Sequence, residues 1–68
     1  MSRFVSLMSQ VKERGKGPER EGQALMDILY TDYRDVYAEL IAEGIDVYYL
    51  EYPVPTTVWL FIAERISD

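Results

Sequence analysis

Four carboxylates at spacings of three and four residues are the side chains of this sequence best placed to act together. They are Asp32, Asp35, Glu39 and Glu43. Such neighbours share one edge of a helix. A solvated helix face is the simplest interpretation of this acidic edge, docking against a basic partner surface is the second, and a divalent-cation site is the third. The third is disfavoured because a calcium site needs a chain that wraps around the ion, and a straight helix edge does not wrap.

The sequence holds few of the side chains that usually carry catalysis. It has no His and no Cys, which removes the commonest general base at neutral pH and the thiolate nucleophile. The same absence removes the usual zinc ligands and any disulfide. Paired carboxylates can hydrolyse glycosides, but a chain of 68 residues offers no sugar-binding cleft. We therefore expect a protein that is not an enzyme and that binds no cofactor, metal ion or small-molecule substrate.

Charge is divided unevenly along the chain, whose net charge is −5. Residues 1–20 hold five basic side chains against two acidic ones, whereas residues 21–68 hold two basic side chains against ten acidic ones. The candidate nucleic-acid contacts are Lys12, Arg14, Lys16 and Arg20. Nucleic-acid binding depends on neutralising phosphates, so the acidic total makes it the weaker interpretation. The alternative is that this basic segment packs against the acidic body of its own or a neighbouring subunit.

Tyrosine is unusually frequent, with six copies. They are Tyr30, Tyr33, Tyr37, Tyr48, Tyr49 and Tyr52. Tyrosine combines a large apolar contact area with a polar tip and is enriched at protein interfaces. We expect Tyr33 and Tyr49 in the core. The candidate interface aromatics are Tyr48, Tyr52 and Trp59, and for Trp59 a place in the core is the competing interpretation.

The periodicity of apolar residues predicts two helices that would carry these side chains. The first covers residues 1–14, because Phe4, Leu7, Met8 and Val11 recur on one helical face. A flexible basic loop over 15–22 follows, rich in glycine and charge. The second helix covers residues 23–43 as one long amphipathic element that Gly44 ends. The alternative is a break at Thr31–Asp32, two residues that are natural helix N-caps.

Residues 45–63 predict a β-hairpin because they are rich in β-branched and aromatic side chains. Pro53 and Pro55 would lie in its connection, and residues 64–68 would form a polar tail. A helix from Thr56 onward is the alternative, but its apolar side chains would surround the axis. A two-stranded hairpin is marginal alone and leaves unpaired edges, so a symmetric partner chain would complete the sheet.

The expected fold is therefore α+β, a single domain in the order α-α-β-β with the long helix packed on the hairpin, completed by dimerisation. A winged-helix-like arrangement is the alternative if the long helix breaks. Its expected DNA-reading helix, residues 32–39, carries three carboxylates and one arginine, and phosphates would repel it. In length, acidity and lack of Cys the chain resembles small accessory and inhibitor proteins of phages and mobile elements.

The expected function is that of a non-catalytic protein-binding module that modulates or inhibits a larger macromolecule through an acidic, Tyr-rich surface. We expect no small-molecule substrate. The alternatives are a small DNA-associated transcriptional regulator that uses residues 12–20, and a small subunit of a larger complex. We expect a homodimer with a larger protein partner. The sequence shows no apolar signal region and no run of 18 uncharged apolar residues, so we expect a cytoplasmic protein without a membrane segment.

Overall fold

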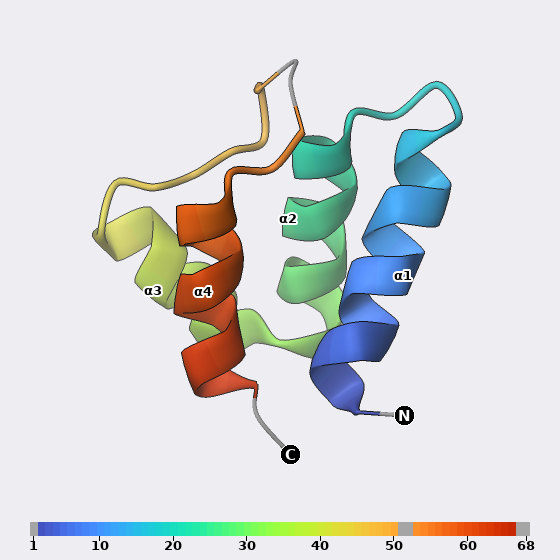
Figure 1. Ribbon diagram of the computed structural model, residues 1–68. Coiled ribbons are helices and arrows are strands. Elements are labelled where there is room, and N and C mark those ends of the chain that lie inside the picture. The colour runs from blue at the N-terminus through green and yellow to red at the C-terminus, as the bar shows by residue number, and fades with distance from the viewer. Residues whose placement is uncertain (1, 51–52, 67–68) are drawn as a thin grey trace.

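The computed structural model describes residues 2–50 and 53–66, and within them it contains helices but no strand. The helices are α1 (Arg3–Gly15), α2 (Glu21–Asp32), α3 (Arg34–Ala42) and α4 (Thr56–Arg65). Figure 1 shows α1 and α2 as antiparallel neighbours, with α3 and α4 on the other side of α2 and a long loop joining α3 to α4. The molecule is therefore a helical bundle with α2 at its centre.

The predicted β-hairpin over 45–63 is wrong, and with it the α+β fold and the winged-helix alternative. Among the described residues of this segment, 45–50 form an irregular loop and Thr56–Arg65 form a helix. The helix buries Val58, Trp59 and Ile62, a spacing that places them on one side of a helix. Pro55 precedes it as the N-cap residue, with φ −62°. Proline suits this position because the first helical turn does not need its missing N–H.

The predicted polar tail over 64–68 is also wrong where the structure describes it. Helix α4 continues to Arg65, and Ile66 is only 1% exposed. Residues 67 and 68 lie outside the described part of the chain. Ile66 lies four residues after Ile62 and therefore continues the buried side of α4.

The predicted continuous helix over 23–43 is wrong because Tyr33 separates α2 from α3, with φ −140° and ψ 58°. The alternative prediction, a break at Thr31–Asp32, lies within two residues of the observed interruption at Tyr33. However, neither Thr31 nor Asp32 acts as an N-cap. The Thr31 hydroxyl instead donates a hydrogen bond to the Asp27 carbonyl, 3.1 Å away within α2. The break turns α3 away from the axis of α2 (Figure 1).

The predicted N-terminal helix is confirmed as α1. The side chain of Ser2 caps it and accepts a hydrogen bond from the Val5 N–H at 3.1 Å, as serine commonly does at this position. Leu7 and Val11 are buried against α2. Phe4 packs edge-to-face on Trp59, with ring centroids 6.0 Å apart, and so links α1 to α4.

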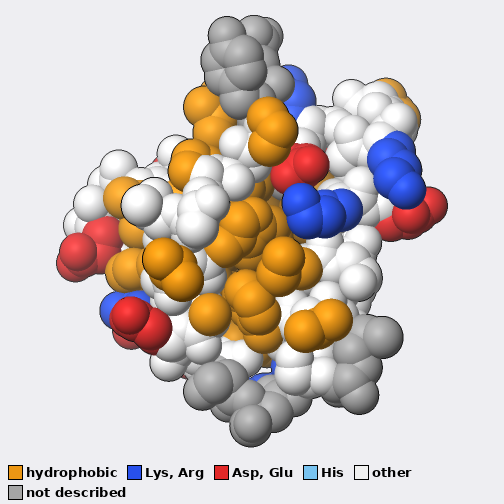
Figure 2. Space-filling model, viewed as in Figure 1, with side chains coloured by type: hydrophobic (Ala, Val, Ile, Leu, Met, Phe, Trp, Pro, Cys, Tyr) orange, Lys and Arg blue, Asp and Glu red, His pale blue; other side chains and the backbone are white. Residues whose placement is uncertain are grey.

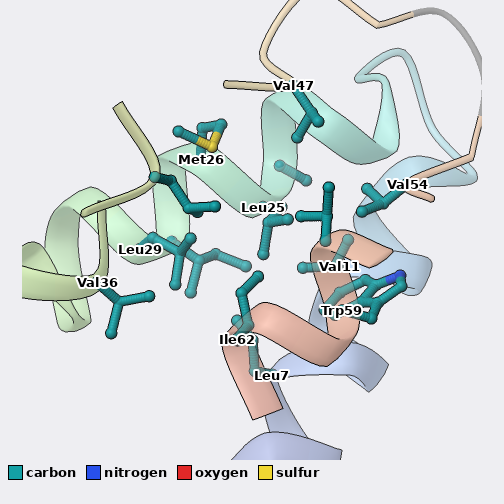
Figure 3. Close-up of a cluster of buried hydrophobic side chains, with 14 of the residues drawn as sticks. Leu7, Val11, Leu25, Met26, Leu29, Val36, Val47, Val54, Trp59 and Ile62 are labelled. Atoms are coloured by element: carbon teal, nitrogen blue, oxygen red, sulfur yellow. The ribbon is translucent and has the colours of Figure 1, made fainter. Parts of the chain in front are cut away.

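The core is built from side chains of all four helices and of the loop between α3 and α4 (Figure 3). Helix α2 contributes more core residues than any other element, namely Ala24, Leu25, Met26, Ile28 and Leu29, and it also buries Gly22. The loop adds Val47 and Val54. Most of the described apolar residues that predicted a hairpin are thus buried in, or packed against, the core of their own chain, whereas Tyr49 and Leu60 are exposed. The homodimer prediction depended on unpaired strand edges, and the described residues contain no such edge.

Gly44 ends α3 as the sequence predicts. Its φ is +73°. The N–H of Ile45 bonds to the Leu40 carbonyl and that of Gly44 to the Ile41 carbonyl, both at 3.1 Å. This pair of bonds is the Schellman motif, which satisfies the last carbonyls of a helix.

Changing Gly44→Ala should lower the free energy of unfolding by about 1 kcal/mol, because a Cβ atom disfavours the left-handed backbone region. No neighbouring atom would obstruct that Cβ, so the cost comes from the backbone alone. Gly44→Asn is the matched control and should cost less, because asparagine tolerates this conformation. Chemical denaturation measures both values. Equal stability of wild type and Gly44→Ala would contradict the assigned backbone.

Candidate protein-binding surface

The four predicted carboxylates do not lie on one helix. Asp32 ends α2, Asp35 and Glu39 lie on α3, and Glu43 is the C-cap of α3. All four are exposed. Glu39 forms an ion pair with Arg65 of α4 and so contributes to holding α3 against α4. Within the described part of the chain, the other three have no ion-pair partner.

Helix α3 buries only two side chains, Val36 and Leu40. At 100° per residue, Ala38 lies opposite them and faces solvent, with Asp35 on one side of it and Ile41 on the other. Ile41 is 44% exposed. The outer surface of α3 therefore combines carboxylates with apolar contact area.

An aromatic pair borders this surface. The rings of Tyr30 and Tyr37 meet edge-to-face with centroids 5.1 Å apart, and Tyr30 is 48% exposed. The guanidinium of Arg34 lies over the Tyr30 ring at 3.8 Å, and its Nε donates a hydrogen bond to the Tyr30 carbonyl at 2.8 Å. Arg34 is thus held at the junction of α2 and α3. It forms no ion pair with a described carboxylate.

Two cations of the predicted nucleic-acid segment are engaged in ion pairs. Arg14 forms two hydrogen bonds with Glu19, both at 3.0 Å, and lies 3.8 Å from Asp27 of α2. Lys16 lies 3.5 Å from Glu13. Two of these pairs, with Glu19 and Glu13, neutralise the basic segment through its own carboxylates, and the contact between Arg14 and Asp27 joins it to α2.

The remaining two cations have different surroundings. Arg20 donates hydrogen bonds from Nε and Nη2 to the Tyr48 carbonyl, at 3.4 and 3.3 Å. It therefore anchors the loop after α3 to the start of α2. Lys12 is exposed and makes no hydrogen bond or ion pair with any described residue. One unengaged lysine does not form a basic surface.

The structure separates the three predicted interface aromatics. Trp59 is 8% exposed and belongs to the core. Tyr48 is half-buried in the loop after α3. Tyr52 lies outside the described residues. Tyr49 was expected in the core, but this is wrong, because it is 81% exposed. Tyr33 packs against the core as expected and remains half-buried.

A small hollow lies between the loop and helices α2 and α3. It measures about 230 Å³ and is lined by Met26, Tyr37, Asp46, Tyr48 and Tyr49. The Tyr48 and Tyr49 rings have centroids 4.9 Å apart and planes at 70°. Sequence analysis did not find this hollow. The cluster of tyrosines was visible, but Tyr37 approaches the loop only because the chain turns at Tyr33.

Hydrogen bonds fix the loop side of the hollow. The Tyr48 N–H donates to Oδ1 of Asp46 at 2.9 Å. The Tyr48 hydroxyl accepts a bond from Nε2 of Gln23 at 3.4 Å. A turn bond of 3.1 Å joins the Leu50 N–H to the Val47 carbonyl. The ring of Tyr48 and the carboxylate of Asp46 therefore have defined positions.

Apolar side chains are also exposed away from the outer surface of α3. Figure 2 shows hydrophobic side chains gathered at the centre of this view, over α4 and toward α1, with acidic side chains around them, over α3 at the left and also above and to the right. Leu60 of α4 is 59% exposed. In the described residues, no group of three or more acidic side chains is arranged to hold a metal ion. No described helix is both long and apolar enough to cross a membrane.

Comparison with known proteins gives no relative from which a function can be transferred. No family model matches the chain, and neither a curated protein nor a solved structure is significantly similar to it.

Proposed function

We propose that this protein is a non-catalytic protein-binding module that modulates a larger macromolecule. Its docking surface is the acidic tyrosine surface, defined as the exposed side of α3 with Asp32, Asp35 and Glu43, together with Tyr30 and the loop residues Asp46 and Tyr49. The observation that carries the proposal is the exposure of these carboxylates without an ion-pair partner among the described residues, together with the exposure of Tyr30 and Tyr49.

Charge and contact area support different parts of this proposal. Unpaired carboxylates favour approach to a basic surface and raise the rate of association at low salt. Exposed tyrosines provide apolar area with a polar tip, which suits the centre of an interface. A basic protein surface matches both features. A nucleic acid does not, because its phosphates would be repelled and most of the basic segment is engaged within the chain.

Site-specific photo-cross-linking in the native host tests the proposal. A photoreactive amino acid at Ala38 reports on the outer side of α3, and one at Lys12 on the exposed side of α1 is the matched control. We expect one discrete protein adduct from position 38 and none from position 12. Changing Asp35→Lys and Glu43→Lys together should reduce the adduct severalfold, because each lost ion pair costs about 0.2–1 kcal/mol and reversal adds repulsion.

Salt provides the second control. The adduct from position 38 should decrease between low and high ionic strength, because screening weakens attraction between exposed charges. An adduct that is equally strong from both positions, or that is unaffected by the double charge reversal, would contradict the proposed surface. A nucleic-acid adduct would favour the regulator alternative instead.

A further inference from the structure

The hollow beside Asp46 is the most chemically specific feature of the described surface. Its volume of about 230 Å³ is below the range of about 300–1,000 Å³ that is usual for pockets of drug-sized ligands. It therefore suits a single side-chain end or a small ion. The residues that line the hollow decide which kind of group would bind there.

Three of the five residues that line the hollow are tyrosines, Tyr37, Tyr48 and Tyr49. The face of an aromatic ring carries partial negative charge and attracts a cation within about 6 Å of its centroid. The Tyr48 and Tyr49 rings pack edge-to-face on each other, with centroids 4.9 Å apart and planes at 70°, so together they present an angled aromatic surface rather than a flat platform. Tyr37 adds a third tyrosine from α3. Met26, only 2% exposed, lines the hollow from the core side.

Asp46 adds a full negative charge. Its Oδ1 accepts the Tyr48 N–H, and among the described residues its other oxygen has no hydrogen-bond partner. An anion would be repelled here, a neutral donor would gain only a hydrogen bond from the carboxylate, and a cation would gain both the charge attraction and contact with the ring faces. A calcium ion needs six or more oxygen ligands, which a hollow with one carboxylate does not offer. The lining therefore favours an organic cation.

The nearest cation of the protein lies outside the hollow. The Arg20 guanidinium is 6.0 Å from the Tyr49 ring centroid and is bound to the Tyr48 carbonyl. Arg20 is not among the residues that line the hollow. Its charge lowers the attraction for a second cation, so we expect weak binding by the hollow alone.

We propose that this hollow binds an alkylammonium group, and that its natural ligand is a methylated lysine side chain of the partner protein. Methylation makes the cation larger and less strongly hydrated than the compact ammonium of lysine, which favours transfer into an aromatic corner. The assignment of the ligand to a lysine of a partner protein rests on the proposed protein-binding function. The affinity of the hollow for an alkylammonium group does not depend on it.

Titration with choline, followed by NMR, tests the chemistry of the hollow. The matched control ligand is the neutral carbon isostere of choline, in which a tert-butyl group replaces the trimethylammonium group. We expect choline to shift the ring resonances of Tyr37, Tyr48 and Tyr49, with its own methyl signals moving upfield over the rings. The isostere should bind measurably more weakly. Equal binding of the two ligands, or no choline binding, would overturn the proposal.

Variants separate the roles of charge and ring. Asp46→Asn and Tyr49→Leu should each weaken choline binding about two- to fivefold, the factor that corresponds to one exposed ion pair or cation–π contact. Tyr49→Phe keeps the ring and should bind like wild type. Amide NMR spectra establish that each variant is folded. Unchanged affinity of Tyr49→Leu would contradict a binding role for this ring.

The source of the cation is tested with blocked amino acids. We expect blocked trimethyllysine to bind more tightly than blocked lysine, and blocked norleucine to bind least. If choline binds but trimethyllysine does not, the lysine assignment is wrong. If neither binds while the adduct at position 38 persists, this inference fails and the proposed function stands. If both bind while that adduct is absent, the proposed docking surface fails and the ammonium site stands.

Discussion

Changing Ile62→Ala should lower the free energy of unfolding by about 2–5 kcal/mol, the usual cost of emptying a buried aliphatic site. Ile62 is 0% exposed, whereas Leu60 on the same helix is 59% exposed. The matched change Leu60→Ala should therefore alter stability by no more than about 0.5 kcal/mol, as is usual for surface positions. Urea denaturation followed by circular dichroism measures both values.

This pair of variants distinguishes a helix from a strand. In a strand, positions 60 and 62 point to the same face, so Leu60→Ala and Ile62→Ala would have similar effects. In the helix they lie on opposite sides. If Ile62→Ala prevents folding altogether, Ile62→Val should still cost about 0.5–1.5 kcal/mol and keeps the comparison measurable. Similar losses at the two positions would contradict α4.

Changing Gly22→Ala should destabilise the protein by about 1–3 kcal/mol, the cost of overpacking a tight site. A Cβ atom at position 22 would lie 2.0 Å from the Val47 carbonyl oxygen. That atom belongs to the backbone and cannot rotate away, so the loop itself must move. The matched control is Gly17→Ala, whose nearest contact, the Arg14 carbonyl oxygen, is at an ordinary 3.6 Å. It should be neutral or slightly stabilising, since alanine has fewer unfolded conformations than glycine.

The Gly22→Ala change should also impair the hollow, because the displaced loop carries Asp46, Tyr48 and Tyr49. Choline affinity should fall for Gly22→Ala and remain unchanged for Gly17→Ala. Thermal unfolding and choline titration of the two variants therefore measure the same loop contact in two ways. A Gly22→Ala protein with wild-type stability would show that the loop does not lie against α2 at this position.

The sequence predicted the N-terminal part of the fold because its signals are local. In α1, the spacing of Leu7 and Val11 and the cap at Ser2 all favour the same helix. Gly44 likewise ends α3 for a reason that is local to its own backbone. Where propensity, periodicity and capping agree, little is left for tertiary contacts to change.

The C-terminal part could not be predicted in the same way because β-propensity mostly reflects packing on a half-buried surface. The run from Val58 to Ile62 is rich in strand-forming residues, yet α4 packs on a core that α1 and α2 supply. The exposed Leu60 breaks the clean separation of apolar and polar faces that would have identified a helix. Short apolar runs are ambiguous between the two structures.

The positions of the candidate site residues could be predicted in part. The acidic residues Asp32, Asp35 and Glu43 are exposed as expected, but the ion pair between Glu39 and Arg65 depends on α4 and is not visible in the sequence. The hollow depends on a turn at Tyr33, which no side-chain cap marks. Contacts between segments that are distant in the sequence therefore decide which of the predicted residues come together.

The structure removes the reason for which a homodimer was predicted. The expected homodimer would have paired hairpin edges, whereas the apolar residues of α4 are buried mainly in their own chain. Sedimentation equilibrium at micromolar concentration tests this point. A monomer would agree with a core closed within one chain, and a dimer would require a surface other than paired strands.

The central structural claim is that residues 56–65 form a helix that closes the core of a single chain, because this leaves α3 and the loop free to bind. Backbone NMR of the uniformly labelled protein tests it most directly. We expect downfield Cα shifts and strong sequential amide–amide contacts throughout this segment. Upfield Cα shifts, with cross-strand contacts to residues 45–50, would contradict the claim.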